Sequence, residues 1–139
     1  MKILILNGPN LNMTGKREPS IYGSETLDDI NAQIKAHAQK KKCETVFFQS
    51  NCEGELVDEI QKFDGDGIVI NAGAYTHYSY AISDALKMKT CKKIEVHMSN
   101  VFTREEFRHH SVLSPVVDGV ICGLGKNSYI LAVDAILIA

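Results

Sequence analysis

The stretch KILILN, residues 2–7, is a run of branched apolar side chains that predicts a strand buried on both faces. Two segments of similar character follow it along the chain, ETVFFQ at residues 44–49 and GIVIN at residues 67–71. Residues 8–24 are rich in Gly, Pro, Asn and Ser, which predicts a long loop directly after the first strand.

Helical periodicity separates these runs. Leu27, Ile30 and Ile34 share one face of a helix that is expected to begin near Thr26, with Thr26 and Asp29 as its cap pair. Further helices are expected at about residues 53–63, 78–88 and 126 to the end, further strands at 93–97 (KIEVH) and 118–122 (DGVIC), and a single turn capped by a T-x-x-E box at 103–107.

Five strands that alternate with helices predict an α/β fold. The expected arrangement is a flavodoxin-like, doubly wound sheet of five parallel strands, forming a single domain over residues 1–139. A chain of this length can bury a core of its own without disulfides or a structural metal. In such sheets, ligands bind beyond the carboxyl ends of the strands.

The composition is that of an ordinary globular protein, with 45% hydrophobic and 23% charged residues. The net charge of 15 − 17 = −2 gives no sign of a nucleic-acid or membrane partner. Asp134 interrupts the apolar C-terminal run, so no stretch reaches the ~18 apolar residues of a membrane span. The cysteines form no C-x-x-C pair, which favours free thiols and a cytoplasmic location: Cys43, Cys52, Cys91 and Cys122.

The segment from Gly119 to Lys126 looks like a phosphate-binding loop only superficially. Val120 stands where a Walker loop requires its first glycine, and Asn127 stands where Ser or Thr should follow the lysine. The segment is therefore predicted to be a tight turn into the last helix. Because the histidines and cysteines also lack metal-ligand spacing, the sequence predicts no metal site and no cofactor.

Polar side chains end three of the predicted strands: Asn7, Asn71 and His97. The carboxyl ends of parallel strands meet at one edge of the sheet, so a shared site is expected there. Glu95 lies two residues before His97 and on the same face of its strand. A carboxylate in this position fixes the imidazole tautomer and favours the protonated ring. A purely structural hydrogen bond between the two side chains would produce the same pattern.

The chain has three arginines, Arg17, Arg104 and Arg108, and its other cations are lysines. A guanidinium offers a planar fork that binds oxyanions, so the segments that carry these arginines are candidate anion contacts. Arg17 and Tyr22 lie in the same loop, at about residues 12–24, which is predicted to act as a lid. A packed surface loop is the alternative interpretation.

These segments together resemble the type II 3-dehydroquinate dehydratases. The resemblance runs in order from residue 1 to about residue 135. It is carried by LNGPNLN (6–12), REP (17–19) with Tyr22-Gly23, QSN (49–51), NAGAYTH (71–77), EVHMSN (95–100), REEFR (104–108) and GLG (123–125). It implies the flavodoxin-like fold and a homododecamer, built as a tetramer of trimers. It also implies conversion of 3-dehydroquinate to 3-dehydroshikimate and water, through an enolate, in the shikimate pathway.

The resemblance further implies a role for each matched residue. Tyr22 matches the base, and Arg17 matches the arginine that activates the base. His97 matches the general acid, with Glu95 behind it, and Asn10 matches the residue that orients a water near the developing enolate. Substrate contacts fall on Asn71, His77, Asp84, Met98, Ser99 and Arg108, and Arg104 matches a lid-facing arginine. Asp84 is expected to reach the site of a neighbouring subunit.

Tyrosine is a scarce base at neutral pH, because its ordinary pKa is about 10. Lowering this pKa by ~3 units requires about 4 kcal/mol of preference for tyrosinate. One cation at about 4 Å in an effective dielectric of ~20 provides an energy of that order. Arg17, with Arg104 as a second cation, is therefore sufficient to activate Tyr22.

The sequence departs from the family pattern at Phe102, where relatives often carry a more polar residue, and at His109, which replaces a frequent arginine. These changes bear on lid packing and affinity rather than on the reaction. Two alternatives are a nucleotide- or flavin-binding module of the same fold and a non-catalytic relative. The missing phosphate loop disfavours the first, and the intact set of matched catalytic residues disfavours the second.

Overall fold

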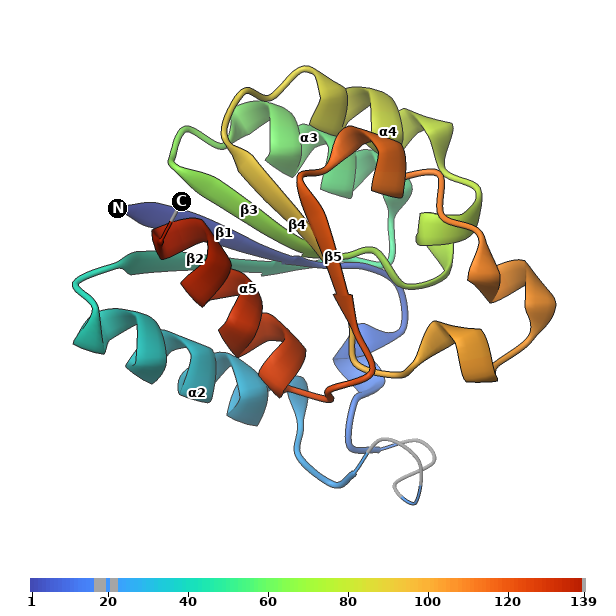
Figure 1. Cartoon of the computed structure of the whole chain (residues 1–139), viewed down its shortest axis with the longest axis horizontal. Coiled ribbons are helices and arrows are strands. Elements are labelled where there is room, and N and C mark those ends of the chain that lie inside the picture. The colour runs from blue at the N-terminus through green and yellow to red at the C-terminus, as the bar shows by residue number, and fades with distance from the viewer. Residues whose placement is uncertain (17–19, 21–22, 139) are drawn as a thin grey trace.

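Five parallel strands form one sheet in the computed structural model, which describes residues 1–16, 20 and 23–138 (Figure 1). The strands are β1 (Lys2–Asn7), β2 (Glu44–Gln49), β3 (Gly67–Asn71), β4 (Lys92–His97) and β5 (Gly119–Cys122). Their order across the sheet is β2-β1-β3-β4-β5, and every neighbouring pair is parallel. The predicted doubly wound, flavodoxin-like arrangement is therefore confirmed.

Helices cover both faces of the sheet (Figure 1). They are α2 (Leu27–Lys40) and α5 (Asn127–Leu137) on one face, and α3 (Glu53–Lys62) and α4 (Tyr80–Lys87) on the other. The predicted bounds of helices and strands differ from these by one or two residues, which is within the usual uncertainty of where an element ends.

The start of α2 shows the expected reciprocal cap. The Thr26 hydroxyl accepts from the backbone N–H of Asp29 at 3.2 Å, and the Asp29 carboxylate accepts from the backbone N–H of Thr26 at 3.0 Å. This pair satisfies two backbone donors that have no partner within the helix, so it fixes where α2 begins.

Side chains of β1 alternate between two separate cores. Ile3 and Ile5 pack in the core under α2 and α5, whereas Leu4 and Leu6 pack in the core under α3 and α4. All four are fully buried, because β1 lies inside the sheet and both of its faces are covered. The alternation places Asn7 on the α2/α5 side at the end of the strand.

The prediction of a single capped turn at residues 103–107 is wrong. Two short 3₁₀ turns, Val101–Thr103 and Glu106–His109, flank an extended Arg104 instead. The cap of the first turn is Asn100, whose side-chain oxygen accepts from the backbone N–H of Phe102 at 3.1 Å. The Thr103 hydroxyl donates to the Asn100 carbonyl, and the second turn is preceded by Glu105, which makes no side-chain cap.

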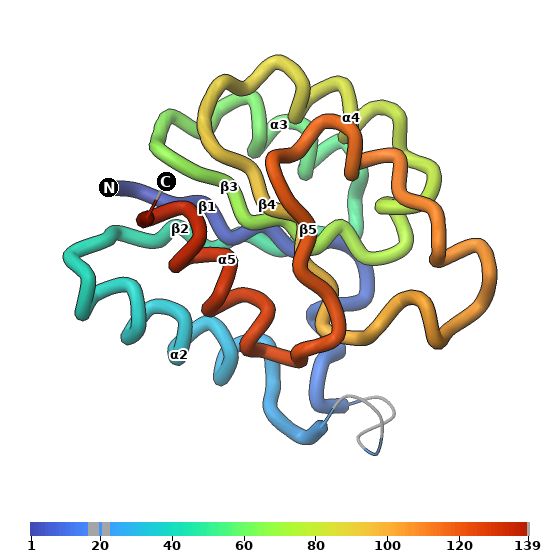
Figure 2. Tube along the Cα trace, viewed as in Figure 1, coloured from blue at the N-terminus to red at the C-terminus, as the bar shows by residue number. Residues whose placement is uncertain are grey.

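Loops that follow β1, β3 and β4 gather at the carboxyl edge of the sheet, away from the amino end of β1 (Figure 2). Glycines allow two close approaches there. A Cβ on Gly8 would collide with the Ala72 carbonyl, and Gly123 adopts a φ of 90° beside Asn100 in the predicted tight turn before α5. No helix within the described part of the chain is long and apolar enough to cross a membrane.

Candidate active site

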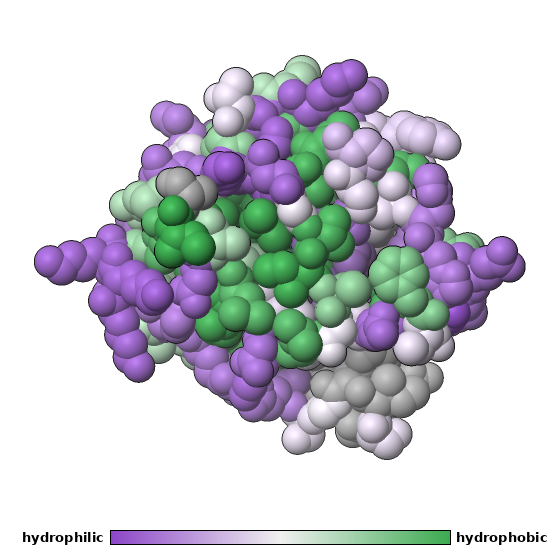
Figure 3. Space-filling model, in the orientation of Figure 1, coloured by the Kyte–Doolittle hydropathy of each residue, from purple (hydrophilic) through white to green (hydrophobic). Residues whose placement is uncertain are grey.

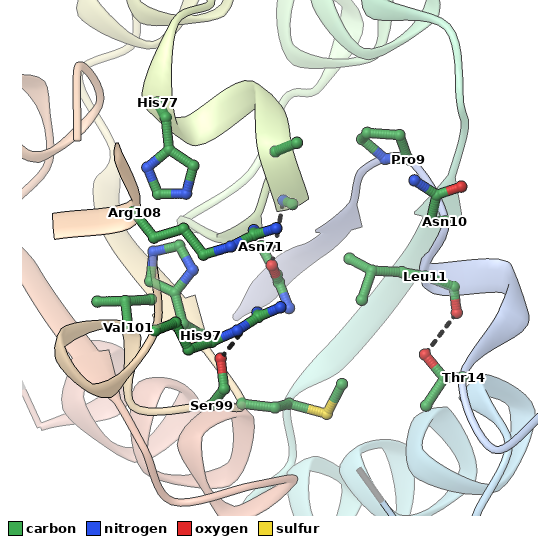
Figure 4. Close-up of a pocket in the computed structure, with 14 residues that line it drawn as sticks. Pro9, Asn10, Leu11, Thr14, Asn71, His77, His97, Ser99, Val101 and Arg108 are labelled. Carbon is green, nitrogen blue, oxygen red and sulfur yellow. Dashed lines mark hydrogen bonds between the residues drawn. The ribbon is translucent and has the colours of Figure 1, made fainter. Parts of the chain in front are cut away.

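A cavity of about 150 Å³ opens at the carboxyl edge of the sheet (Figure 4). Its walls come from the loops after β1, β3 and β4, which follow one another across the sheet. Eight residues predicted from the sequence line it: Asn10, Asn71, His77, His97, Met98, Ser99, Arg104 and Arg108. The structure therefore brings most of the predicted site together where the strand order predicts a ligand.

His97 and Glu95 form a buried pair at the end of β4. The His97 Nε2 lies 2.6 Å from the Glu95 Oε2, and the two residues are 7% and 1% exposed. A carboxylate oxygen accepts, so Nε2 carries the hydrogen of this bond. Nδ1 is then the ring nitrogen that can exchange a proton with a molecule in the cavity.

The second oxygen of Glu95 accepts two serine hydroxyls. Ser111 Oγ donates to Glu95 Oε1 at 3.0 Å, and Ser114 Oγ donates to the same atom at 2.9 Å. Burial raises the pKa of Glu95, but the hydrogen bond and charge of His97 and the two serine hydroxyls outweigh it and hold the pKa below the ordinary value. The carboxylate thus stays ionised behind His97 at neutral pH.

His77 faces the cavity as a neutral ring. Burial lowers its pKa, and the nearby charges of His97 and Arg108 act in the same direction, against a hydrogen bond to the His110 carbonyl. The His77 Nδ1 lies 2.7 Å from that carbonyl oxygen, which can only accept, so Nδ1 carries the proton. Nε2 is therefore an acceptor, suited to a hydroxyl of a bound molecule.

Two guanidinium groups line the same cavity. Arg108 Nε donates to Glu105 Oε1 at 3.3 Å, and its Cζ lies 4.6 Å from the centre of the Phe107 ring. Arg104 donates from an NH group to the Ser99 hydroxyl at 3.4 Å and lies 3.9 Å from the Glu105 carboxylate. These contacts hold two cations beside the buried His97, which favours an anionic ligand.

Asn10 enters the cavity from a left-handed backbone, with a φ of 70°. Its backbone N–H donates to Asn51 Oδ1 at 3.0 Å, and Gln49 Nε2 donates to the same oxygen at 3.2 Å. Gln49 also donates to the Gly8 carbonyl at 3.1 Å. The QSN segment at residues 49–51 therefore supports the loop that carries Asn10.

Besides Glu95, which lies behind His97, three predicted site residues are not placed in the cavity. Asp84 is exposed on α4 and does not line it. Arg17 and Tyr22 lie outside the described residues, as does the central part of the predicted lid loop. Of that loop, Thr14 is buried and lines the cavity wall opposite His77 and His97 (Figure 4).

The two departures from the family pattern lie outside the cavity lining. Phe102 is 63% exposed, and its ring centre lies 5.7 Å from that of His109. The His109 Nε2 lies 3.2 Å from the Arg104 carbonyl oxygen. The two residues therefore contact each other, and His109 also contacts the backbone of the arginine segment.

Sequence reasoning missed several residues that the site uses. Ser111 and Ser114 are ordinary polar residues of a loop, and nothing local marks them as partners of Glu95. Tyr129 does carry a signal, because it stands at a buried position near the start of the otherwise apolar helix α5. A hydroxyl at such a position needs a partner.

The described residues contain no group of three or more His, Cys, Asp or Glu side chains that could hold a metal ion.

Comparison with known proteins gives consistent matches along the chain. The family model described as "Dehydroquinase class II" matches residues 1–137. A 3-dehydroquinate dehydratase of Clostridium beijerinckii is 54% identical, and the match covers 98% of this chain and 95% of that protein.

Solved structures match equally well. The type II dehydroquinase of Butyrivibrio crossotus is 54% identical and matches with a TM-score of 0.95. The type II dehydroquinase of Propionibacterium acnes is 42% identical, with a TM-score of 0.96. Each match covers 99% of this chain and 97% of the other.

Proposed function

The chain belongs to the class II dehydroquinase family, and on this premise we propose that it converts 3-dehydroquinate to 3-dehydroshikimate and water in the shikimate pathway of aromatic amino-acid biosynthesis. The observation that carries the proposal is the buried pair of His97 and Glu95 in a cavity that also holds Arg104 and Arg108. This arrangement provides a proton donor beside a binding site for an anion.

The reaction begins with removal of a proton next to the substrate ketone. Tyr22, as tyrosinate, takes the proton, and the electrons of the broken C–H bond move into the enolate. Arg17 favours the tyrosinate, and Arg104 adds a second cation. Asn10 orients a water toward the enolate oxygen, where negative charge develops.

The second step expels the hydroxyl group. The enolate electrons form the carbon–carbon double bond, and the C–O bond breaks with its electron pair on oxygen. His97 gives this oxygen its Nδ1 proton, so the leaving group is water. Glu95 holds Nε2 and stabilises the imidazolium before the transfer. Proton exchange with solvent then restores Tyr22 and His97.

Substrate binding uses the remaining residues of the cavity. Asn71 and the Met98–Ser99 segment hold the substrate carboxylate, while His77 Nε2 and Arg108 bind hydroxyl groups. Asp84, exposed on α4, completes the site of a neighbouring subunit. No cofactor takes part.

The proposed assembly is a cytoplasmic homododecamer, a tetramer of trimers. An apolar surface over β5 and α5 supports self-association (Figure 3). The exposed apolar residues of these elements and the turns beside them are Val120, Leu124, Leu131 and Ile138.

Addition of 3-dehydroquinate should produce ultraviolet absorbance of the conjugated enone, and Tyr22→Phe should bind substrate without turning it over.

Borohydride added with substrate should leave the protein mass unchanged, because the proposed route forms no imine with a lysine. Absence of enone absorbance, or a bound flavin or nucleotide in the purified protein, would contradict the proposal.

A further inference from the structure

A buried chain of hydrogen bonds runs behind the floor of the cavity. Asn7 and Asn71 are register partners at the ends of the adjacent strands β1 and β3. Tyr129 of α5 is fully buried, and its hydroxyl lies between them. The hydroxyl donates to Asn7 Oδ1 at 2.6 Å and accepts from Asn71 Nδ2 at 2.9 Å.

One backbone group fixes the direction of this chain. The N–H of Gly73 can only donate, and it donates to Asn71 Oδ1 at 3.2 Å. The Asn71 amide must therefore turn its Nδ2 toward Tyr129, whose oxygen accepts. The single hydroxyl proton of Tyr129 is then directed to Asn7. A reversed Asn71 amide would place an NH₂ group against the N–H of Gly73.

We propose that Tyr129 is a positioning residue for the dehydration, which holds the Asn71 amide in the one orientation that presents its second N–H to the substrate. The inference rests on the proposed function, because Asn71 is there a substrate contact. Tyr129 itself does not line the cavity and touches no reacting atom.

The chemistry of Tyr129 supports this role. Burial raises the pKa of Tyr129 well above its ordinary value, against the hydrogen bond from Asn71, so the hydroxyl keeps its proton for Asn7 at neutral pH. A phenylalanine would fill the same apolar space without the cost of burying a hydroxyl. The hydroxyl is thus useful for its two hydrogen bonds.

The test is Tyr129→Phe, which keeps the ring and removes the oxygen. We expect kcat/KM for 3-dehydroquinate to fall at least tenfold, with kcat falling by a larger factor than KM rises, because the substrate still binds but is misaligned. Tyr80→Phe is the matched control on an exposed tyrosine of α4 and should change kcat/KM less than twofold.

A double-mutant cycle separates positioning from stability. In an Asn71→Ala background, Tyr129→Phe should reduce kcat/KM less than twofold, since the amide it positions is gone. A reduction by the same factor in both backgrounds, or no reduction in either, would overturn the proposal.

If Tyr129→Phe does not fold, Asn7→Ala provides the same test without changing the ring. The Tyr129 proton then loses its acceptor and competes for Asn71 Oδ1, so kcat/KM should also fall at least tenfold, and an unchanged value would overturn the proposal. Failure of the unaltered protein to turn over 3-dehydroquinate would refute the proposed function instead. In that case, a crystal structure of the folded variant would test whether Tyr129 orients Asn71. An unmoved Asn71 side chain would refute this role, and a rotated side chain would support it.

Discussion

At the scale of single residues, the site depends on how Glu95 stays ionised in the interior. Its carboxylate accepts from His97, Ser111 and Ser114, and all three bonds favour the charged form. The serines therefore act on the chemistry indirectly, because they stabilise the charge of the carboxylate that accepts the hydrogen bond of His97 Nε2.

Replacing both serines, as Ser111→Ala with Ser114→Ala, should destabilise the protein at pH 7 by about 1.5–3 kcal/mol for each lost hydrogen bond to the carboxylate. The folded-state pKa of Glu95 is lowered, so its stabilisation is present above the unfolded pKa and is lost as the pH falls through the folded pKa. The difference in unfolding free energy between the variant and the unaltered protein should therefore become smaller below about pH 4.

Urea unfolding at pH 7 and pH 3.5, at one fixed protein concentration, would measure this difference. Ser83→Ala on α4 is the matched control and should change stability little at either pH. An equal difference in unfolding free energy at the two pH values would show that the serines do not act through the charge of Glu95.

Arg17→Met should do more than weaken binding. If Arg17 lowers the pKa of Tyr22, its loss should lower kcat and shift the ascending limb of the pH–rate profile to higher pH, where the tyrosine ionises again. Activity should partly return in alkaline buffer. A rise in KM alone, with an unmoved profile, would make Arg17 a substrate clamp and leave Arg104 as the next candidate for the activating cation.

At the scale of elements, the ends of helices and strands decide where side chains enter the site. The turn between β5 and α5 places Gly123 against Asn100, which caps the turn that leads into Arg104. Two parts of the chain that are distant in sequence thus determine the path of the arginine segment together.

Gly123→Ala should destabilise the protein by about 1–2 kcal/mol, because its φ of 90° disfavours any side chain. The new Cβ would also lie 3.2 Å from the Asn100 Cβ. Gly54→Ala on α3 is the matched control, because a Cβ added at Gly54 meets nothing within 4 Å. This substitution should leave the stability unchanged or increase it. Thermal unfolding of both variants checks this, and equal effects would contradict it.

Lys93→Met should also destabilise the fold. The buried amine of Lys93 donates to the carbonyls of Leu86 at 3.1 Å and Lys89 at 2.6 Å, at the end of α4. Methionine keeps the apolar stem but leaves both carbonyls without this donor, at a cost of about 1–3 kcal/mol. Lys87→Met is the matched control, because Lys87 is exposed on α4, and it should leave the unfolding free energy almost unchanged. Equal losses of unfolding free energy in the two variants would refute a stabilising role for the Lys93 hydrogen bonds.

Elements with local periodicity were predictable, and contacts between distant segments were not. The buried runs of β1 and β3 and the apolar face of α2 are visible in a few consecutive residues. The turn at residues 103–107 was mispredicted because a T-x-x-E box describes one turn in isolation, while Asn100 provides the cap here.

The residues of the candidate site also fall into a predictable group and an unpredictable group. Asn71 and His97 end strands, so the strand order alone brings them to one edge. Ser114 lies 19 residues from Glu95, and Tyr129 lies 122 residues from Asn7. Such pairings depend on how helices and loops pack over the sheet, which no local pattern records.

At the scale of the whole molecule, the apolar surface over β5 and α5 bears on assembly (Figure 3). β5 is an edge strand of the sheet, and within the described residues it pairs with β4 alone. Exposed strand edges and apolar patches both favour association with another chain. If the proposed oligomer completes the site through Asp84, activity per chain should fall on dilution once the subunits separate, and a fully active monomer would contradict this.

Subunit mixing tests the proposed sharing of the site between subunits directly. Asp84→Ala and His97→Ala chains, each impaired alone, should regain activity when co-expressed, because a site with one chain's His97 and the other chain's Asp84 is complete. Mixing His97→Ala with Arg108→Ala should not restore activity, since both residues line the cavity of one chain. Equal results from the two mixtures would show that Asp84 does not act across subunits.

The central position of β1 has a consequence for the newly made protein. The strand is synthesised before its partners β2 and β3, which end at Gln49 and Asn71. At about 5–20 residues per second, translation from the end of β1 to the end of β3 takes on the order of 3–13 s. Until β3 is complete, the apolar residues 3–6 lack at least one of their two flanking strands, so we expect this segment to be a site of chaperone binding and of early aggregation in the nascent chain.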